Sequence, residues 1–234
     1  MQYNDFSGLI LVNKPVGITS FKLVHIIRKK LKVKKAGHCG TLDPLASGLM
    51  IVLIGKYTKL QDKFMKQDKV YHATIKLGMK TDSGDLDGNI ISQSDFSHVT
   101  KELIEQACKS FTGKIQQVPP MYSALKVNGQ KLYELARKGI NVERKPREIT
   151  IYSIDLTDYQ KNRFSIRVKC SSGTYIRTLA EDIGIQLKTD TVLTNLVREE
   201  IGNCKLTDAI NVDNIKENDY SCLKQVDFQN NKFI

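Results

Sequence analysis

A glycine-rich segment around one aspartate is the part of this sequence best suited to chemistry. Asp43 stands within residues 37–48, which contain three glycines and lead into the apolar run 49–54. Glycines permit positive φ and close approach of another chain, and Pro44 restricts the backbone of the aspartate before it. A carboxylate held in a fixed place can act as a nucleophile or stabilise a sugar cation. Taken without its context, the same aspartate would be interpreted as the cap of a turn before proline.

The charge balance favours a polyanionic partner. The 234 residues include 36 Lys+Arg and 25 Asp+Glu, a formal net charge of +11. Cations that contact phosphates release condensed counterions, so nucleic acid is the leading candidate. The basic run 28–35 precedes the glycine-rich segment and fits either a solvated helix end or a phosphate contact. No stretch reaches the roughly 18 apolar residues of a membrane span, so no membrane partner is expected.

Cysteine and histidine usage disfavours a metal enzyme. The five cysteines are scattered without a CxxC pair, and the four histidines offer no HxxxH pair. Neither a zinc site nor a disulfide framework is indicated. The N-terminus lacks the basic start and apolar run of a secretory signal, which predicts a cytoplasmic protein. We expect no metal.

The elements that must position Asp43 follow from the apolar periodicity. Residues 8–12 read as a buried strand, followed by a turn and a helix cap at Thr19 or Ser20. The helix should bury its apolar positions, which recur at helical spacing: Phe21, Val24, Ile27 and Leu31.

The rest of the chain mixes strands and helices irregularly. Strands are expected over 49–54, 70–77 and 192–197, a hairpin over 148–156 and 164–170, and helices over 101–111, 131–137 and 175–187. Residues 83–88 mimic part of a calcium loop but lack its final glutamate, which predicts a tight turn. Such a mixture predicts an α+β fold with a central, largely antiparallel mixed sheet flanked by helices and loops.

The segment around Asp43 also carries a family resemblance. Residues 37–48, GHCGTLDPLASG, closely resemble the GHxGTLDPxAxG signature of the TruB family of tRNA pseudouridine synthases. Further segments are similar to the family's in the same order, from residue 8 to about 210: 11–20, 69–71, 77–82, 119–126 and 170–177. So many ordered matches are far more specific than any single motif.

The resemblance implies the pseudouridine-synthase fold and an isomerase that converts the uridine at position 55 in the T-loop of tRNA. That reaction breaks N1–C1′, turns the base and joins C5 to C1′, with no redox change and no cofactor. Asp43 would be the catalytic carboxylate. Whether it attacks C1′, attacks C6 or abstracts a sugar proton stays open.

Three further roles carry over by resemblance. Tyr71 would stack on the flipped uridine, although by its strand position it reads as a core aromatic. Arg177 would pair with Asp43 and keep it ionised, although it could be a surface cation. Tyr175 would lie against the uracil and is a candidate base for the C5 proton, although it reads as a hydrophobic residue at a helix start.

Four substrate-binding residues are weaker assignments. Leu196 would form a pocket wall, which plain core packing mimics. His38 would fill the gap left by the flipped base or bond its own turn. Lys14 would brace the active-site loop or touch phosphate, and Asp82 would hold the loop beneath the RNA.

Two departures limit the resemblance. Val197 stands where many relatives have a basic residue, so one phosphate contact is missing or supplied elsewhere. Longer members carry a C-terminal PUA domain, whereas here we expect a catalytic domain over 1–212 and a short tail over 213–234 without one. Weaker tRNA binding is predicted, unless the basic run compensates or the sequence is part of a longer chain.

The principal hypothesis is therefore a stand-alone, monomeric enzyme that acts on the T-arm of tRNA and needs no protein partner. A second hypothesis is a non-catalytic module that binds and folds tRNA. A third is a guide-dependent synthase subunit, which would depend on partner proteins.

Overall fold

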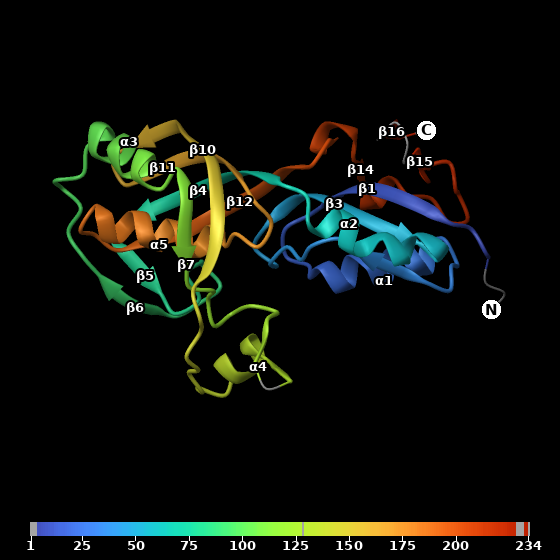
Figure 1. Cartoon of the computed structure of the whole chain (residues 1–234), viewed down its shortest axis with the longest axis horizontal. Helices are drawn as coiled ribbons and strands as arrows, with labels where there is room; N and C mark the ends of the chain where they lie inside the picture. Colours follow the sequence, from blue (N-terminus) through green and yellow to red (C-terminus); the bar gives the residue numbers. More distant parts are fainter. Residues whose placement is uncertain (1–3, 128, 228–231, 234) are drawn as a thin grey trace. The chain divides into compact units, whose positions relative to one another are not determined.

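The computed structural model describes residues 4–127, 129–227 and 232–233. The chain divides into two compact units. Unit 1 comprises Met1–Tyr71 and Val197–Ile234, and unit 2 comprises His72–Leu196. Two strands, β4 (Lys69–Leu77) and β12 (Thr191–Ile201), carry residues of both units (Figure 1). Within the described ranges, every helix is too short or too polar to cross a membrane.

Unit 1 is built on mostly antiparallel strands. The order is β14 (Ile210–Asn211), β1 (Gly8–Lys14), β3 (Ser47–Ile54) and β12. β1 pairs antiparallel over its full length with residues 48–54 of β3, and β2 (Ala36–His38) and β13 (Cys204–Lys205) add antiparallel pairs. β14 and β12 pair in parallel. The strands expected over 8–12 and 49–54 are confirmed.

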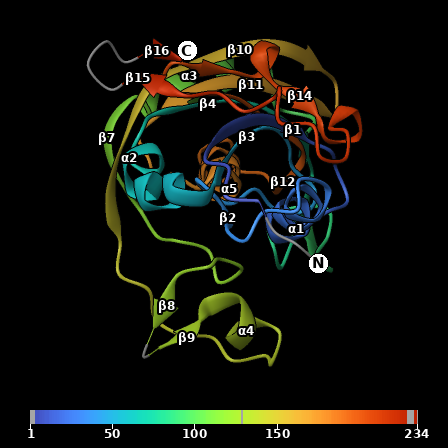
Figure 2. The ribbon, with the colours of Figure 1, turned by 90° about the vertical axis from the view of Figure 1, so that its right-hand side faces the viewer.

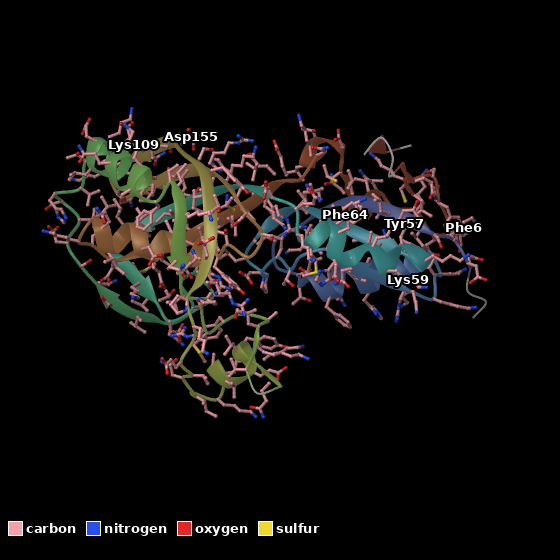
Figure 3. The ribbon with its side chains drawn as sticks, viewed as in Figure 1. Phe6, Tyr57, Lys59, Phe64, Lys109 and Asp155 are labelled. Atoms are coloured by element: carbon pink, nitrogen blue, oxygen red, sulfur yellow. The ribbon has the colours of Figure 1, made fainter. Side chains whose placement is uncertain are left out.

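One face of these strands is covered by a short helical stretch. The 3-10 helix η1 (Gly55–Leu60) leads into α2 (Gln61–Met65). Phe64 of α2 belongs to the core cluster and Tyr57 of η1 packs against it; both are labelled in Figure 3. The cluster takes alternate residues of β1 and β3, as period-2 burial requires, together with two buried cysteines: Leu9, Leu11, Leu49, Ile51, Leu53, Cys39 and Cys204. The short elements η2 (Leu206–Asp208) and η3 (Val212–Asn214) follow β13 and β14.

The helix expected after Thr19 is α1 (Ser20–Lys30), and Thr19 caps it. Its buried face differs from the prediction, because Phe21 is 78% exposed while Leu23 is fully buried. Ser20 explains the difference. Its side chain is buried in hydrogen bonds to the Asp43 segment, which rotates the helix so that positions 23, 24, 27 and 31 face inward and Phe21 faces solvent.

The segment after residue 212 folds onto unit 1. Lys224 exchanges backbone hydrogen bonds of 2.8 and 3.0 Å with Leu9 of β1. The Tyr220 hydroxyl donates to the Leu31 carbonyl at 2.9 Å, and its ring stacks on Phe6. A hairpin of β15 (Val226–Asp227) and β16 (Lys232–Phe233) follows. The domain limits predicted from the sequence stay a prediction.

Unit 2 contains the rest of the strands. β4, β11 (Arg163–Cys170), β10 (Arg147–Gln160) and β7 (Gly113–Gln117) lie in that order. β10 pairs antiparallel with both β11 and β7, which confirms the expected hairpin. The α+β class with a largely antiparallel mixed sheet is also confirmed.

Helices α3 (Lys101–Ser110) and α5 (Ile176–Gln186) pack against each other, and α3 packs against β10. Both helices match the sequence prediction. A segment with β8 (Lys126–Val127), β9 (Gln130–Lys131) and α4 (Leu132–Ala136) projects away from the strands of unit 2 in both views (Figures 1 and 2). The short helix expected over 131–137 is therefore confirmed.

Residues 82–89 connect β5 (Met79–Thr81) to β6 (Ile90–Gln93), which pair antiparallel. The tight turn predicted for 83–88 is confirmed.

Candidate active site

The loop that carries Asp43 is tied to the start of α1 on both sides of the aspartate. The Ser20 hydroxyl accepts from the Leu42 N–H at 2.8 Å and donates to the Leu42 carbonyl at 2.9 Å. On the other side, the Gly17 N–H donates to the Pro44 carbonyl at 2.8 Å. The half-buried Asp43 side chain thus projects from a backbone that is fixed before and after it.

A buried arginine lies under the same loop. Arg198 is 1% exposed, and its Nε donates to the Leu49 carbonyl at 2.8 Å. Its Nη1 and Nη2 donate to the carbonyls of Thr41 and Gly40 at 3.4 and 3.2 Å. The sequence predicts no role for Arg198, because a cation two residues after a buried leucine carries no local signal of what it binds.

Lys14, predicted to brace the loop or touch phosphate, is fully buried. Its Nζ donates to the carbonyls of Pro15 and Ile18 at 2.9 and 2.7 Å, so it braces the turn before α1. Burial lowers the pKa of Lys14 from 10.5 to about 8, although Asp43 opposes the fall; Arg198 adds to it. Removing an ammonium from water favours its neutral form.

His38 precedes the loop in β2 and is half-buried. Its backbone carbonyl accepts from the Gln61 side chain at 3.1 Å, and its Nδ1 is buried without a hydrogen-bond partner among the described residues. Burial, followed by the charge of Arg198, lowers its pKa, so the ring is neutral at neutral pH. Insertion of this ring into RNA stays a prediction.

Cys39, beside His38, is not a nucleophile. The thiol is 1% exposed, and burial raises its pKa to about 12. A protonated thiol in the core does not react.

Tyr71 ends the unit 1 part of β4. It is 8% exposed and shares its strand face with three further buried residues, as expected: Ala73, Ile75 and Leu77. This burial fits a core aromatic and also a ring that stacks on a base when tRNA binds, so the stacking role stays a prediction.

In unit 2, Arg177 lies at the start of α5 with its guanidinium held on three sides. Nη1 donates to the Ser83 carbonyl at 2.8 Å and Nη2 to the Tyr122 carbonyl at 2.7 Å. Nε lies 3.6 Å from an Asp85 carboxylate oxygen, and both side chains are buried. The expected pairing partner Asp43 belongs to unit 1, and that pairing stays a prediction.

Asp85, for which the sequence predicts no role, is the carboxylate that lies beside the Arg177 guanidinium. Its carboxylate accepts from the Ser83 hydroxyl at 2.6 Å and from the Asp87 N–H at 3.1 Å. These bonds lock the carboxylate within its own turn. The only sequence signal was the acidic turn itself.

Asp82, predicted to hold this loop, accepts from the backbone and side chain of Asn89 at 2.9 and 3.3 Å. It is exposed and closes the turn that contains Asp85. Its place beneath the RNA stays a prediction.

Tyr175 is positioned by a buried glutamine. The Gln117 side chain accepts from the Tyr175 N–H at 2.8 Å and donates to the Tyr175 carbonyl at 3.1 Å. Gln117 is 2% exposed, and a buried primary amide that bonds the N–H and the carbonyl of one residue fixes the backbone there. Leu196, the last residue of unit 2, is 7% exposed, which fits both a pocket wall and core packing.

The structure thus gathers the predicted residues in two sets. Unit 1 contains Lys14, His38, Asp43 and Tyr71, and unit 2 contains Asp82, Tyr175, Arg177 and Leu196. The first set includes a carboxylate on a backbone that is fixed before and after it, and the second includes a buried guanidinium with three partners and a tyrosine whose backbone is fixed. A carboxylate, a cation and an acid–base phenol are the groups that glycosidic bond cleavage and proton transfer at carbon require.

Comparisons with known proteins agree with this chemistry. The model of the TruB family pseudouridylate synthase (N terminal domain) matches residues 28–176. The tRNA pseudouridine synthase B of Endomicrobium trichonymphae is 54% identical over 89% of this chain and 90% of its own length. That of Clostridium perfringens is 49% identical over 90% of this chain and 72% of its own.

Solved structures show the same fold. A Cbf5-Nop10-Gar1 complex contains a chain with 30% identity and a TM-score of 0.68, over 88% of this chain and 54% of that one. The archaeal box H/ACA sRNP Nop10-Cbf5 complex gives 25% identity and a TM-score of 0.66. This chain spans about half the length of each.

Proposed function

Because the chain belongs to the TruB family of pseudouridylate synthases, we propose that it isomerises the uridine at position 55 in the T-loop of tRNA, with Asp43 as the catalytic carboxylate. The chain is a tRNA pseudouridine synthase with the pseudouridine-synthase fold that the sequence predicts. The observation that carries the proposal is the fixed Asp43 loop, tied on both sides to the turn and helix before it.

The roles of the other residues follow from the reaction. The uridine leaves the stack, and Tyr71 supplies a ring for it, since stacking on an aromatic is worth roughly 1–3 kcal/mol per base. Asp43 acts at the sugar or the base while N1–C1′ breaks. After C5 joins C1′, the C5 proton passes to the Tyr175 oxygen as that hydroxyl gives its own proton to water, N1 takes up a proton from water, and Arg177 keeps the carboxylate ionised. No atom is added and no electrons are transferred, which is why no cofactor enters the proposal.

We further propose that the exposed face of α1 binds tRNA phosphates. Lys22, Arg28 and Lys29 are exposed there, and α1 contains no acidic residue. The described residues offer none of the three an ion-pair partner. The N-terminal end of α1 is bonded to the Asp43 loop through Ser20, and eleven residues extend about 16 Å from it. The exposed Phe21 at that end offers its ring to an unpaired base.

Stand-alone action is the form we propose, rather than a guide-dependent subunit. The relative that shares 54% identity over 90% of its own length is named a tRNA pseudouridine synthase B, whereas the chain of the Cbf5-Nop10-Gar1 complex shares 30% and is matched over half its length. We expect a monomer in the cytoplasm, where tRNA is available, which size-exclusion chromatography and cell fractionation would check.

The decisive experiment is tritium release. Purified protein, without metal or nucleotide, is mixed with tRNA that carries tritium at C5 of its uridines, and Asp43→Asn serves as the comparison. Release by the wild type and none by Asp43→Asn is the expected result. Intact tRNA binding with no release by the wild type would leave only the non-catalytic folding module.

A further inference from the structure

We propose that Arg198 is the positioning residue that sets the geometry of the Asp43 loop, holding both of its ends from one strand. This inference rests on the proposed function, because it concerns the reactivity of Asp43. Arg198 touches no reacting atom in this proposal and acts through the loop.

The side chain of Arg198 connects the two ends of the Asp43 loop through hydrogen bonds. One guanidinium donates to the carbonyls of Gly40 and Thr41, before Asp43, and to that of Leu49, after the loop. The planar fork of arginine directs its N–H groups in fixed directions, so these three acceptors are held at set positions relative to one another. The residues between Thr41 and Leu49, including Asp43, therefore form a segment with both ends tethered.

The backbone of the same residue holds the loop at a further point. Arg198 is the parallel partner of Gly48, and Val197 that of Ser47. Gly48 has φ +104°, and a Cβ there would lie 2.4 Å from the Arg198 carbonyl oxygen. The loop returns to β3 through a contact so close that only glycine fits, which fixes where the loop ends.

The burial of Arg198 favours a role in positioning the Asp43 loop over a role in stabilising the fold. The side chain is 1% exposed, and no carboxylate of the described residues lies within ion-pair distance of it. An apolar side chain would fill this space without the desolvation of a charge. What an apolar side chain would lack is donors for the carbonyls of Gly40, Thr41 and Leu49, and those carbonyls set the path of the chain to Asp43.

Small displacements matter at a catalytic carboxylate. A shift of about 1 Å in a reacting group can reduce the rate about a hundredfold, even when the substituted residue lies outside the reacting atoms. We therefore expect Arg198→Ala to lower kcat about a hundredfold while the Kd for tRNA changes less than about threefold.

The experiment measures single-turnover tritium release and tRNA binding for wild type, Arg198→Ala and Lys30→Met. Lys30 is a matched control in the same unit, because its ammonium also donates to backbone carbonyls, at 3.0 Å to Val212 and 2.8 Å to Ile215, outside the Asp43 loop. These bonds and its partial burial separate it from the exposed cations of α1 that are proposed to contact tRNA. Lys30→Met should lower the melting temperature and leave kcat unchanged. Added ethylguanidinium should raise the kcat of Arg198→Ala at least tenfold and leave the kcat of Lys30→Met unchanged.

Three results would overturn the proposal. The first is a folded Arg198→Ala protein with wild-type kcat, and the second is equal loss of kcat and tRNA affinity, which would make Arg198 an RNA contact. If Arg198→Ala does not fold, Arg198→Lys replaces it, because lysine keeps the charge and lacks the planar guanidinium. We expect at least a tenfold fall in kcat for Arg198→Lys. Wild-type kcat in a folded Arg198→Lys protein is the third result that would overturn the proposal. An inactive wild type, by contrast, would refute the proposed function itself.

Discussion

The two units each contain a buried arginine, and they hold it in different ways. Arg198 in unit 1 donates only to backbone carbonyls, from residues on either side of the Asp43 loop. Arg177 in unit 2 also donates to two carbonyls but has the Asp85 carboxylate beside its Nε. A guanidinium among carbonyls fixes backbone, whereas one beside a carboxylate is oriented by charge. The first fixes the loop of Asp43, the proposed catalytic carboxylate, and the second is suited to the charge-pairing role proposed for Arg177.

The largest effect in this comparison is expected from Asp85→Asn. Removing one partner of a buried ion pair leaves the other charge uncompensated, which costs about 4 kcal/mol of the free energy of unfolding. A guanidinium that loses its orientation also loses most of its electrostatic effect, so kcat should fall by up to about a thousandfold. Tritium release and chemical denaturation measure both quantities.

The matched control is Asp87→Asn, which removes the same charge from an exposed side chain of the same turn. It should leave both quantities close to wild type. Equal losses in the two variants would show that net charge matters, rather than the Asp85–Arg177 contact.

A second test concerns the backbone contact of unit 1. Gly48→Ala places a Cβ 2.4 Å from the Arg198 carbonyl oxygen at φ +104°, so it combines collision with strain. We expect the free energy of unfolding to fall by about 3 to 4 kcal/mol. Gly113 has φ +109° with open space around it, and Gly113→Ala should lose only about 1 kcal/mol. If the free energy of unfolding falls equally in the two variants, glycine is not required at position 48 for the close approach of Arg198.

A third test concerns the buried ammonium of Lys14 in unit 1. Burial lowers the pKa of Lys14 from 10.5 to about 8, so between these pH values the folded protein binds fewer protons than the unfolded chain. The contribution of Lys14 to the free energy of unfolding therefore rises with pH across this window, by about 3 kcal/mol in full.

Chemical denaturation of wild type and Lys14→Met between about pH 7 and pH 10 measures this contribution. The stability of the wild type relative to Lys14→Met should increase with pH. Parallel curves would show that Lys14 titrates as an ordinary lysine.

The comparison also shows what the sequence could and could not predict. The longer strands and most helices followed from apolar periodicity, because burial on a strand or helix face is a local property of the chain, whereas β7 and the short α2 were not predicted. Phe21 was an exception within a predicted helix. Its periodicity fitted a core position, but the long-range hydrogen bonds of Ser20 to Leu42 decide which face of α1 is buried.

The site divides in the same way. Asp43 could be found from its glycine-rich context and the family resemblance, which are both local. Arg198 and Gly40 are 158 residues apart, and Arg177 and Ser83 are 94 apart. No spacing rule relates such pairs, so the contacts that Arg198 makes with Gly40 and that Arg177 makes with Ser83 emerge only from the fold.

The smallest expected effect is on tRNA affinity, and its test compares exposed cations of the two units. Lys22, Arg28 and Lys29 on α1 are proposed to contact tRNA phosphates, so their combined change to Gln should raise the Kd for tRNA about tenfold. The slope of log Kd against log salt should fall by about 2, since each phosphate contact contributes about 0.7–0.9. The control triple Lys101, Lys109 and Lys161 to Gln removes the same charge from exposed positions of unit 2, with Lys109 on α3 (Figure 3). If both triples change affinity and slope equally, the α1 face has no special part in binding, and net charge alone attracts the tRNA.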